Sequence, residues 1–135
     1  MTAKEYLNRA YKINRRVTAK MKRLEALKDM VTRMNATLSD MPGSPNMDRS
    51  ELEEIMAKIV DLENDTCSEI DRLVTVMKEV MNAINSVEDA NCQIVLEYRY
   101  LCFRSWEDIA DELGCSMRNV YILHSKALES VKIPT

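Results

Sequence analysis

The sequence of 135 residues is poor both in residues that interrupt helices and in residues that favour strands. It contains 2 glycines and 3 prolines, and only 5% of its residues are aromatic, whereas 46% are hydrophobic and 30% are charged. Few helix breakers and few β-formers favour long helices, and the apolar fraction is large enough for a buried core. The composition therefore predicts an all-α protein, of the size of one small domain with an extension.

The chain also lacks any run of about 18 apolar residues, so we expect no membrane-spanning helix. Residues 1–16 carry charge throughout and have no apolar signal-peptide core, which predicts a cytoplasmic protein whose four cysteines are reduced thiols. No pair of cysteines has zinc-knuckle spacing, and there is neither a glycine-rich phosphate loop nor a nucleophile with a base nearby in sequence. We therefore expect no enzymatic activity, no metal site and no cofactor.

The net charge of −3 conceals an uneven distribution along the chain. Residues 1–38 carry 10 basic and 3 acidic side chains, residues 39–89 carry 4 and 13, and residues 90–135 carry 5 and 6. The three segments thus have net charges of +7, −9 and −1. Because the acidic segment should neutralise much of the field of the basic one, the basic residues alone do not predict a nucleic-acid site.

Apolar residues recur at alternating spacings of three and four in two long segments. The interruption at 39–47 contains two prolines and a glycine, so helices are expected over about 2–38 and 48–88. A short loop forces such helices to run antiparallel, and about five heptads without a helix breaker indicate a coiled coil. The sequence therefore predicts a long antiparallel two-helix coiled-coil hairpin over residues 1–88.

Each seam of the predicted hairpin is broken once by an ionisable residue, Lys20 in the first helix and Glu69 in the second. In the antiparallel register these positions fall opposite each other. We expect either a pair that fixes the register or two side chains that extend to water independently. A second apolar stripe on the second helix should meet the C-terminal unit or another protomer, and it comprises Met56, Ile70, Met77, Met81 and Ile84.

Residues 90–132 have the pattern of three short helices, at about 90–101, 106–113 and 117–131. Ser105 and Ser116 are suitable N-caps, and Gly114 stands where a glycine ends a helix in a left-handed turn. Two helices that cross steeply over a short turn also need a small residue at their contact and a branched apolar residue as a plug. The predicted helix-turn-helix core is Ile109, Ala110, Leu113, Gly114, Val120 and Leu123.

With that core facing inward, the last helix presents a polar side outward. Arg118 could contact guanine and Asn119 adenine, whereas Lys126 and Arg104 are better placed for phosphate. The alternative is an ordinary solvated helix face, and His124 is interpreted as a packing residue beside the inward stripe. The predicted DNA-binding set is Ser116, Arg118, Asn119, Tyr121, Ile122, Ser125, Lys126 and Arg104.

The same region resembles the fourth conserved region of sigma-70-type factors. The resemblance lies in VLEYRY at 95–100, SWEDIADELGCS at 105–116, Val120 and KAL at 126–128. It implies a helix-turn-helix that binds an upstream promoter element. The whole chain, with its MPGSP loop between two helices, resembles short sigma-like proteins encoded by phages and prophages of Gram-positive bacteria, which implies a role in the cytoplasm of a bacterial host.

Two departures from sigma factors limit what the resemblance implies. Nothing in the chain resembles the sigma region that melts promoters, and the last helix and its tail carry only three basic residues, Arg118, Lys126 and Lys132. We expect modest affinity, which dimerisation would improve by doubling the contacts.

The favoured function is therefore a sequence-specific DNA-binding transcription regulator that binds duplex DNA with helix 117–131. Its coiled-coil arm would form a homodimer or contact RNA polymerase. One alternative is a small terminase subunit for DNA packaging, which also joins a helix-turn-helix to an oligomerising coil. The other is an interaction protein that binds RNA polymerase and does not itself bind DNA. The net charge of −1 of residues 90–135 supports this alternative.

Overall fold

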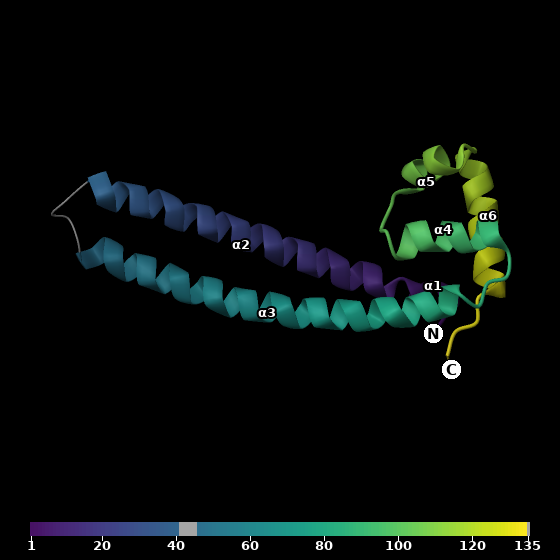
Figure 1. Ribbon diagram of the computed structural model, residues 1–135, viewed down its shortest axis with the longest axis horizontal. Helices are drawn as coiled ribbons and strands as arrows, with labels where there is room; N and C mark the ends of the chain where they lie inside the picture. The colour runs from purple at the N-terminus through teal and green to yellow at the C-terminus, as the bar shows by residue number, and fades with distance from the viewer. Residues whose placement is uncertain (41–45, 135) are drawn as a thin grey trace. The chain divides into compact units, whose positions relative to one another are not determined.

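A computed structural model describes the backbone of residues 1–40 and 46–134 and the side chains of residues 1–36 and 49–134. All regular secondary structure in these residues is helical, which confirms the predicted fold class. None of these helices combines the length and the apolar run that crossing a membrane requires. The helices labelled in Figure 1 are α1 (Ala3–Leu7), α2 (Arg9–Asp40), α3 (Asn46–Ile84), α4 (Ala90–Tyr100), α5 (Trp106–Leu113) and α6 (Met117–Ser130).

The chain divides into two compact units, which we call the hairpin unit (15–71) and the terminal unit (1–14 with 72–135). This division differs from the boundary near residues 88–90 that the sequence suggested. The terminal unit takes up the first residues of the chain because α1 packs against α6 within it. The last turns of α3 belong to the same unit, so the C-terminal helices have apolar partners beyond their own segment.

In the hairpin unit, α2 and α3 run antiparallel and bury the predicted seam between them (Figure 1). Val17, Ile59 and Thr66 are buried there, and the remaining described seam positions are half-buried. A helix with a single partner can cover only one stripe of its surface, so this partial burial is expected of a two-helix unit. The loop was predicted over 39–47, whereas α2 extends to Asp40 and α3 begins at Asn46. Residues 41–45 lie outside the described residues.

The two ionisable residues that interrupt the seam lie next to each other. Lys20 Nζ lies 3.4 Å from Glu69 Oε1 and 2.7 Å from Asp65 Oδ2, and Arg16 Nε lies 3.5 Å from the same Glu69 oxygen. The hydrogen bond to Asp65 and the two carboxylates raise the pKa of Lys20, against a smaller opposing effect of burial. The pairing interpretation is therefore confirmed over that of two independent side chains.

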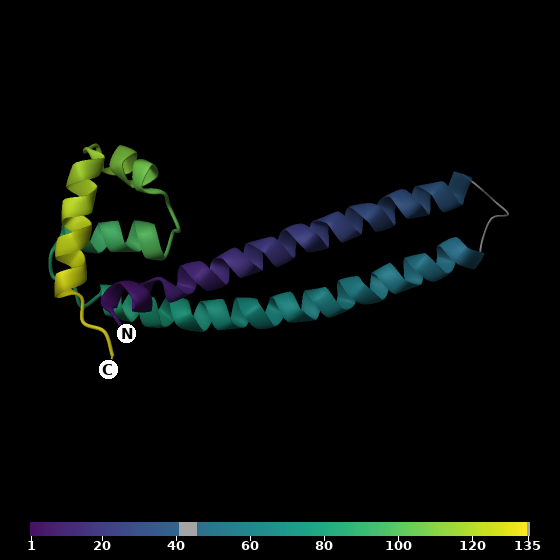
Figure 2. The same cartoon turned by 180° about the vertical axis from the view of Figure 1, so that it is seen from behind.

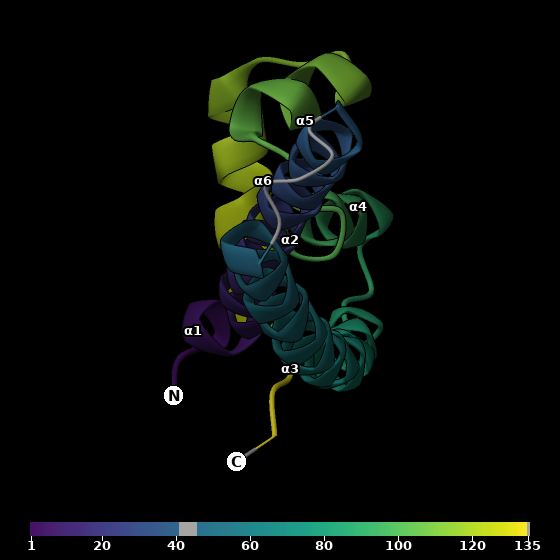
Figure 3. The same cartoon turned by 90° about the vertical axis from the view of Figure 1, so that its left-hand side faces the viewer.

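In the terminal unit, α6 packs against both α4 and α5, and α1 lies beside its C-terminal half (Figure 2). Figure 3 shows α4 and α5 at different levels along α6. The predicted bounds of the last two helices are confirmed to within one residue, and α4 ends one residue before its predicted end.

The long helices depart from their predicted bounds at two points in the terminal unit. The first is a break at Asn8, between α1 and α2, where the Arg9 side-chain Nε donates to the Tyr6 carbonyl at 3.0 Å. The second is the end of α3 at Ile84, short of the predicted residue 88. There Ser86 folds back to the Ala83 carbonyl, with Oγ 2.6 Å from it.

The second apolar stripe on α3 is divided between the two units. Ile84 is fully buried and Met77 is half-buried within the terminal unit, whereas Met81 there is exposed. Met56 and Ile70 in the hairpin unit are exposed as well. Ile84 is thus covered within the terminal unit, and contact of the exposed members with the C-terminal helices or another protomer stays a prediction.

Candidate nucleic-acid interface

Three residues at predicted positions set the two ends of α5 and the start of α6. Ser105 Oγ accepts from the Asp108 N–H at 3.1 Å, and Ser116 Oγ accepts from the Asn119 N–H at 3.2 Å, so both serines are N-caps. Gly114 ends α5 in the left-handed region with φ 64°. A Cβ placed on Gly114 would meet nothing within 4 Å, so the site requires glycine for its backbone conformation and not for close approach of the helices.

Five of the six residues predicted as the helix-turn-helix core pack in one apolar cluster, whereas Gly114 is exposed. Ile109 and Val120 are fully buried, Ala110 is 5% exposed, and Val95 of α4 completes the centre of the cluster. Partly buried side chains surround it, among them the predicted Leu113 and Leu123 as well as Tyr98, Trp106 and Cys115. This core holds α6 against α5 and thereby fixes which side of α6 faces away from the unit.

A second layer of contacts supports α6 through His124, which is buried as predicted. Its Nε2 lies 2.7 Å from the Tyr100 hydroxyl, and its ring meets the edge of Trp106 with centroids 4.7 Å apart. Burial, assisted by Lys4 and Arg99, lowers the pKa of His124 to about 4, and burial raises the pKa of Tyr100 to about 12. At neutral pH the imidazole is therefore uncharged and shares a hydrogen bond with the Tyr100 hydroxyl, so it is a packing group and not a cation for phosphate.

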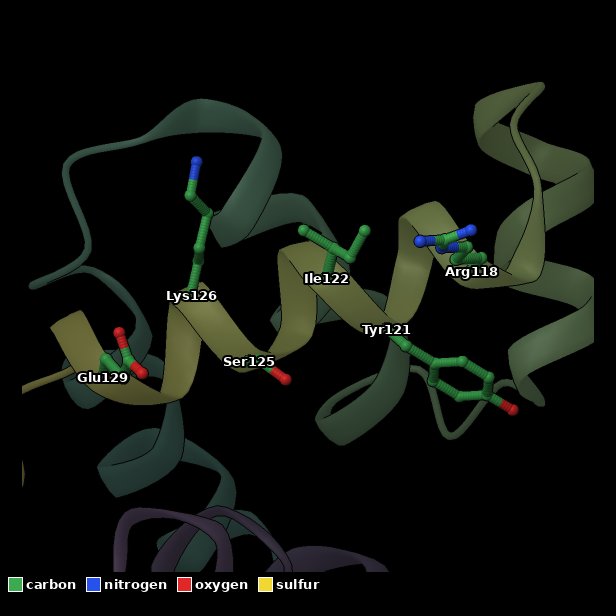
Figure 4. Close-up of a pocket in the computed structure, with 6 residues that line it drawn as sticks. All are labelled: Arg118, Tyr121, Ile122, Ser125, Lys126 and Glu129. Atoms are coloured by element: carbon green, nitrogen blue, oxygen red, sulfur yellow. The ribbon is translucent and has the colours of Figure 1, made fainter.

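The outward side of α6 and its N-cap carry seven of the eight predicted contact residues, all of them exposed. Five of them line a shallow hollow together with Glu129, and Figure 4 shows the six side chains along the helix. The sequence-based set omitted Glu129, whose place one turn beyond Ser125 on the same helix could have indicated it. Asn119 is exposed outside this hollow, and Ser116 uses its hydroxyl as the helix cap.

Arg104 lies apart from the face of α6. Its guanidinium lies 3.3 Å from the Glu112 carboxylate and stacks over the Tyr98 ring at 5.3 Å from the centroid. These contacts within the terminal unit offset the charge of Arg104 and hold its side chain in place. They favour a role for Arg104 in stabilising the unit over a role in binding phosphate.

The face of α6 differs in charge from the neighbouring α5. Arg118 and Lys126 outnumber Glu129 on the α6 face, whereas α5 exposes four carboxylates, those of Glu107, Asp108, Asp111 and Glu112. Tyr121 borders the two helices, and its ring meets that of Trp106 with centroids 5.4 Å apart. Of these two helices, α6 is therefore the one that electrostatics favours for the approach of a polyanion.

The described residues offer little for other chemistry. They contain no group of three or more His, Cys, Asp or Glu side chains that could hold a metal ion. The four cysteines are free thiols, with Cys67 and Cys102 exposed.

Comparison with known proteins finds one family whose model matches the chain. The model of the family described as "Protein of unknown function (DUF1492)" matches residues 48–132, which include all of α4, α5 and α6. The family is one of short proteins of phage type. No curated protein and no solved structure matches the chain.

Proposed function

The chain belongs to the DUF1492 family, and from this premise we propose that it is a sequence-specific DNA-binding protein that regulates transcription. In this proposal α6 lies in the major groove of duplex DNA, as the second helix of a helix-turn-helix does. The observation that carries it is the exposed, cation-bearing face of α6 on a helix-turn-helix framework whose caps, turn and core are all present. The resemblance to sigma region 4 at residues 95–128 supports the same function.

Within this function, the residues of α6 divide by chemistry. Arg118 stands in the first turn, where side chains reach base edges, and its two-pronged guanidinium suits guanine. Lys126 stands two turns later and suits phosphate. Asn119 is exposed in the first turn and suits adenine.

Two exposed cations on α6 predict weak binding by a single chain. With about one unit of salt slope per neutralised phosphate, Lys126 gives a slope near −1 in a plot of log affinity against log salt, since Arg118 is assigned to a base. A homodimer would double this to about −2 and would bind two half-sites about 34 Å apart. We therefore propose that the protein acts as a dimer formed through its coiled-coil hairpin.

Selection of bound sequences from a random duplex pool, followed by competition binding at several salt concentrations, tests the proposal. We expect an enriched motif that the protein prefers over unrelated duplexes at every salt concentration. Equal affinity for all duplexes would contradict sequence-specific binding.

A paired variant assigns the binding to α6. The double substitution Arg118→Ala with Asn119→Ala should abolish the preference for the selected motif. Arg72→Ala with Asn82→Ala removes the same two residue types from exposed positions of α3 and should leave it intact. Equal behaviour of the two double variants would place the DNA contact elsewhere.

A second candidate function is a protein that binds RNA polymerase without contacting DNA. It is favoured by the charge of the terminal unit, whose 10 basic and 10 acidic side chains cancel, and by the four exposed carboxylates on α5. In that case the Arg118 and Asn119 substitutions would leave the DNA affinity unchanged, and the protein would co-migrate with RNA polymerase in the absence of DNA.

A terminase role would instead require a ring of eight or more chains, which a mass measurement distinguishes from a dimer.

A further inference from the structure

We propose that Ile122 determines specificity by contacting the C5 methyl group of a thymine in the DNA site. The inference rests on the proposed function and adds to it the identity of one base. It starts from an apolar side chain that stands where a DNA-binding helix usually carries polar groups. Ile122 is 48% exposed on the outward face of α6.

The neighbours of Ile122 form a row along α6. Arg118, Ile122 and Lys126 follow one another at intervals of four residues, which places them on the same side of a helix. Figure 4 shows Ile122 and Lys126 projecting on one side of α6, with Tyr121 and Ser125 projecting on another. A single apolar side chain thus lies between two cations.

This order of charges matches the major groove. Phosphates border the groove on both sides, and its floor offers hydrogen-bonding groups with one apolar exception, the C5 methyl of thymine. A cation at each end of the row complements the phosphates or a guanine, and the branched side chain between them would meet the methyl. A polar residue at 122 would bond to a base edge, whereas isoleucine can do neither that nor contact phosphate.

The spacing sets where the thymine should lie. Four residues of α-helix rise about 6 Å, and neighbouring base pairs are about 3.4 Å apart, so Arg118 and Ile122 address positions about two base pairs apart. Tyr121 is also exposed, but its ring rests against Trp106 at a centroid distance of 5.4 Å. The selected motif should therefore contain a thymine about two steps from the base that Arg118 contacts.

Replacement of thymine by uracil tests this inference, since uracil lacks only the methyl group. Each thymine of the selected motif is replaced in turn, and the affinity of the wild-type protein is measured by competition. We expect one position, or its symmetric pair, to lose about 4-fold in affinity per methyl, which is the value of one buried methyl group. All other replacements should have little effect.

Substitutions at residue 122 show whether the effect belongs to this side chain. Ile122→Ala should bind the thymine and uracil duplexes equally and should keep the salt slope of the wild type, since no charge is lost. Ile122→Val should retain the discrimination. Val74→Ala shortens another exposed branched residue of the terminal unit, on α3, and should leave the discrimination unchanged.

The outcomes separate this inference from the function on which it rests. If selection yields no motif, the proposed function fails, as it would if the α6 face bound a protein. If a motif is found but it contains no thymine that discriminates against uracil, or if the Ile122→Ala variant still discriminates, the thymine contact alone is overturned.

Discussion

Lys20 of α2 and Glu69 of α3 lie 3.4 Å apart across the hairpin, although 49 residues separate them in the chain. Both side chains are largely buried, with 20% and 18% of their surface exposed. The second carboxylate oxygen of Glu69, Oε2, is buried and has no hydrogen-bond partner among the described residues. A half-satisfied buried pair of this kind adds little to stability, and we expect its contribution to be that it favours one register of the two helices.

Single and double substitutions of this pair should therefore have opposite effects. Lys20→Met leaves the Glu69 carboxylate without its hydrogen-bond partner and should lower the free energy of unfolding more than loss of an exposed ion pair does. Lys20→Met combined with Glu69→Leu should be at least as stable as the wild type. Urea unfolding measures both.

An exposed pair provides the control for that experiment. Lys58 and Glu54 lie 3.9 Å apart, one turn from each other on the surface of α3, so Lys58→Met should change stability by less than about 0.5 kcal/mol. If Lys20→Met were no more costly than Lys58→Met, the pair would not contribute to the hairpin.

Substitutions at Gly114 distinguish backbone conformation from space as the reason for glycine. Because a Cβ would meet nothing within 4 Å, Gly114→Ala should cost only the strain of a left-handed residue, about 1 kcal/mol. Gly114→Asn should cost less, since asparagine tolerates this conformation better. Thermal unfolding of the two variants gives the order, and a larger loss for the bulkier asparagine would mean that the turn is sterically closed.

The sequence predicted those parts of the fold whose signals are local. The bounds of α5 and α6 follow from Ser105, Gly114 and Ser116, each of which acts on the adjacent turn, and the buried core follows from helical periodicity. The pairing of Lys20 with Glu69 was also accessible, because a short loop fixes which positions of two antiparallel helices face each other.

Features that depend on distant contacts were not predicted. The end of α3 at Ile84 involves Ser86, whose hydroxyl also accepts from the Lys132 N–H at 2.9 Å, 46 residues away. Packing of α1 against α6 joins the two ends of the chain. In the candidate site, Arg104 was considered better placed for phosphate than for bases, and the structure brings the Glu112 carboxylate within 3.3 Å of its guanidinium.

The buried His124 should make the protein sensitive to mild acid. Its pKa is about 4 in the folded state, whereas an unperturbed histidine has a pKa of 6.5, so the unfolded chain binds more protons between these limits. The stabilisation is complete above pH 6.5 and is lost as the pH falls toward 4, by about 3 kcal/mol in total.

Urea unfolding at several pH values between 7 and 4 checks this dependence. His124→Gln cannot titrate and should unfold with a flatter pH profile over the same window, although carboxylates contribute equally to both proteins. Parallel profiles for the two proteins would show that another group accounts for the acid sensitivity.

The proposed dimer should depend on an exposed apolar stripe of the hairpin unit. Met56, Val60, Cys67 and Ile70 stand at spacings of four, seven and three on α3, with Glu63 at the seam position between Val60 and Cys67, and all four are exposed. Burial of such side chains stabilises association by about 1.5–3 kcal/mol each, so Ile70→Lys should weaken dimerisation by at least 10-fold. Met30→Lys introduces the same charge at an exposed position of α2 outside the stripe and should leave the dimer intact. Sedimentation equilibrium across a range of concentrations measures both variants. A wild-type protein that stays monomeric at all concentrations, or equal dissociation of the two variants, would remove this stripe as the interface.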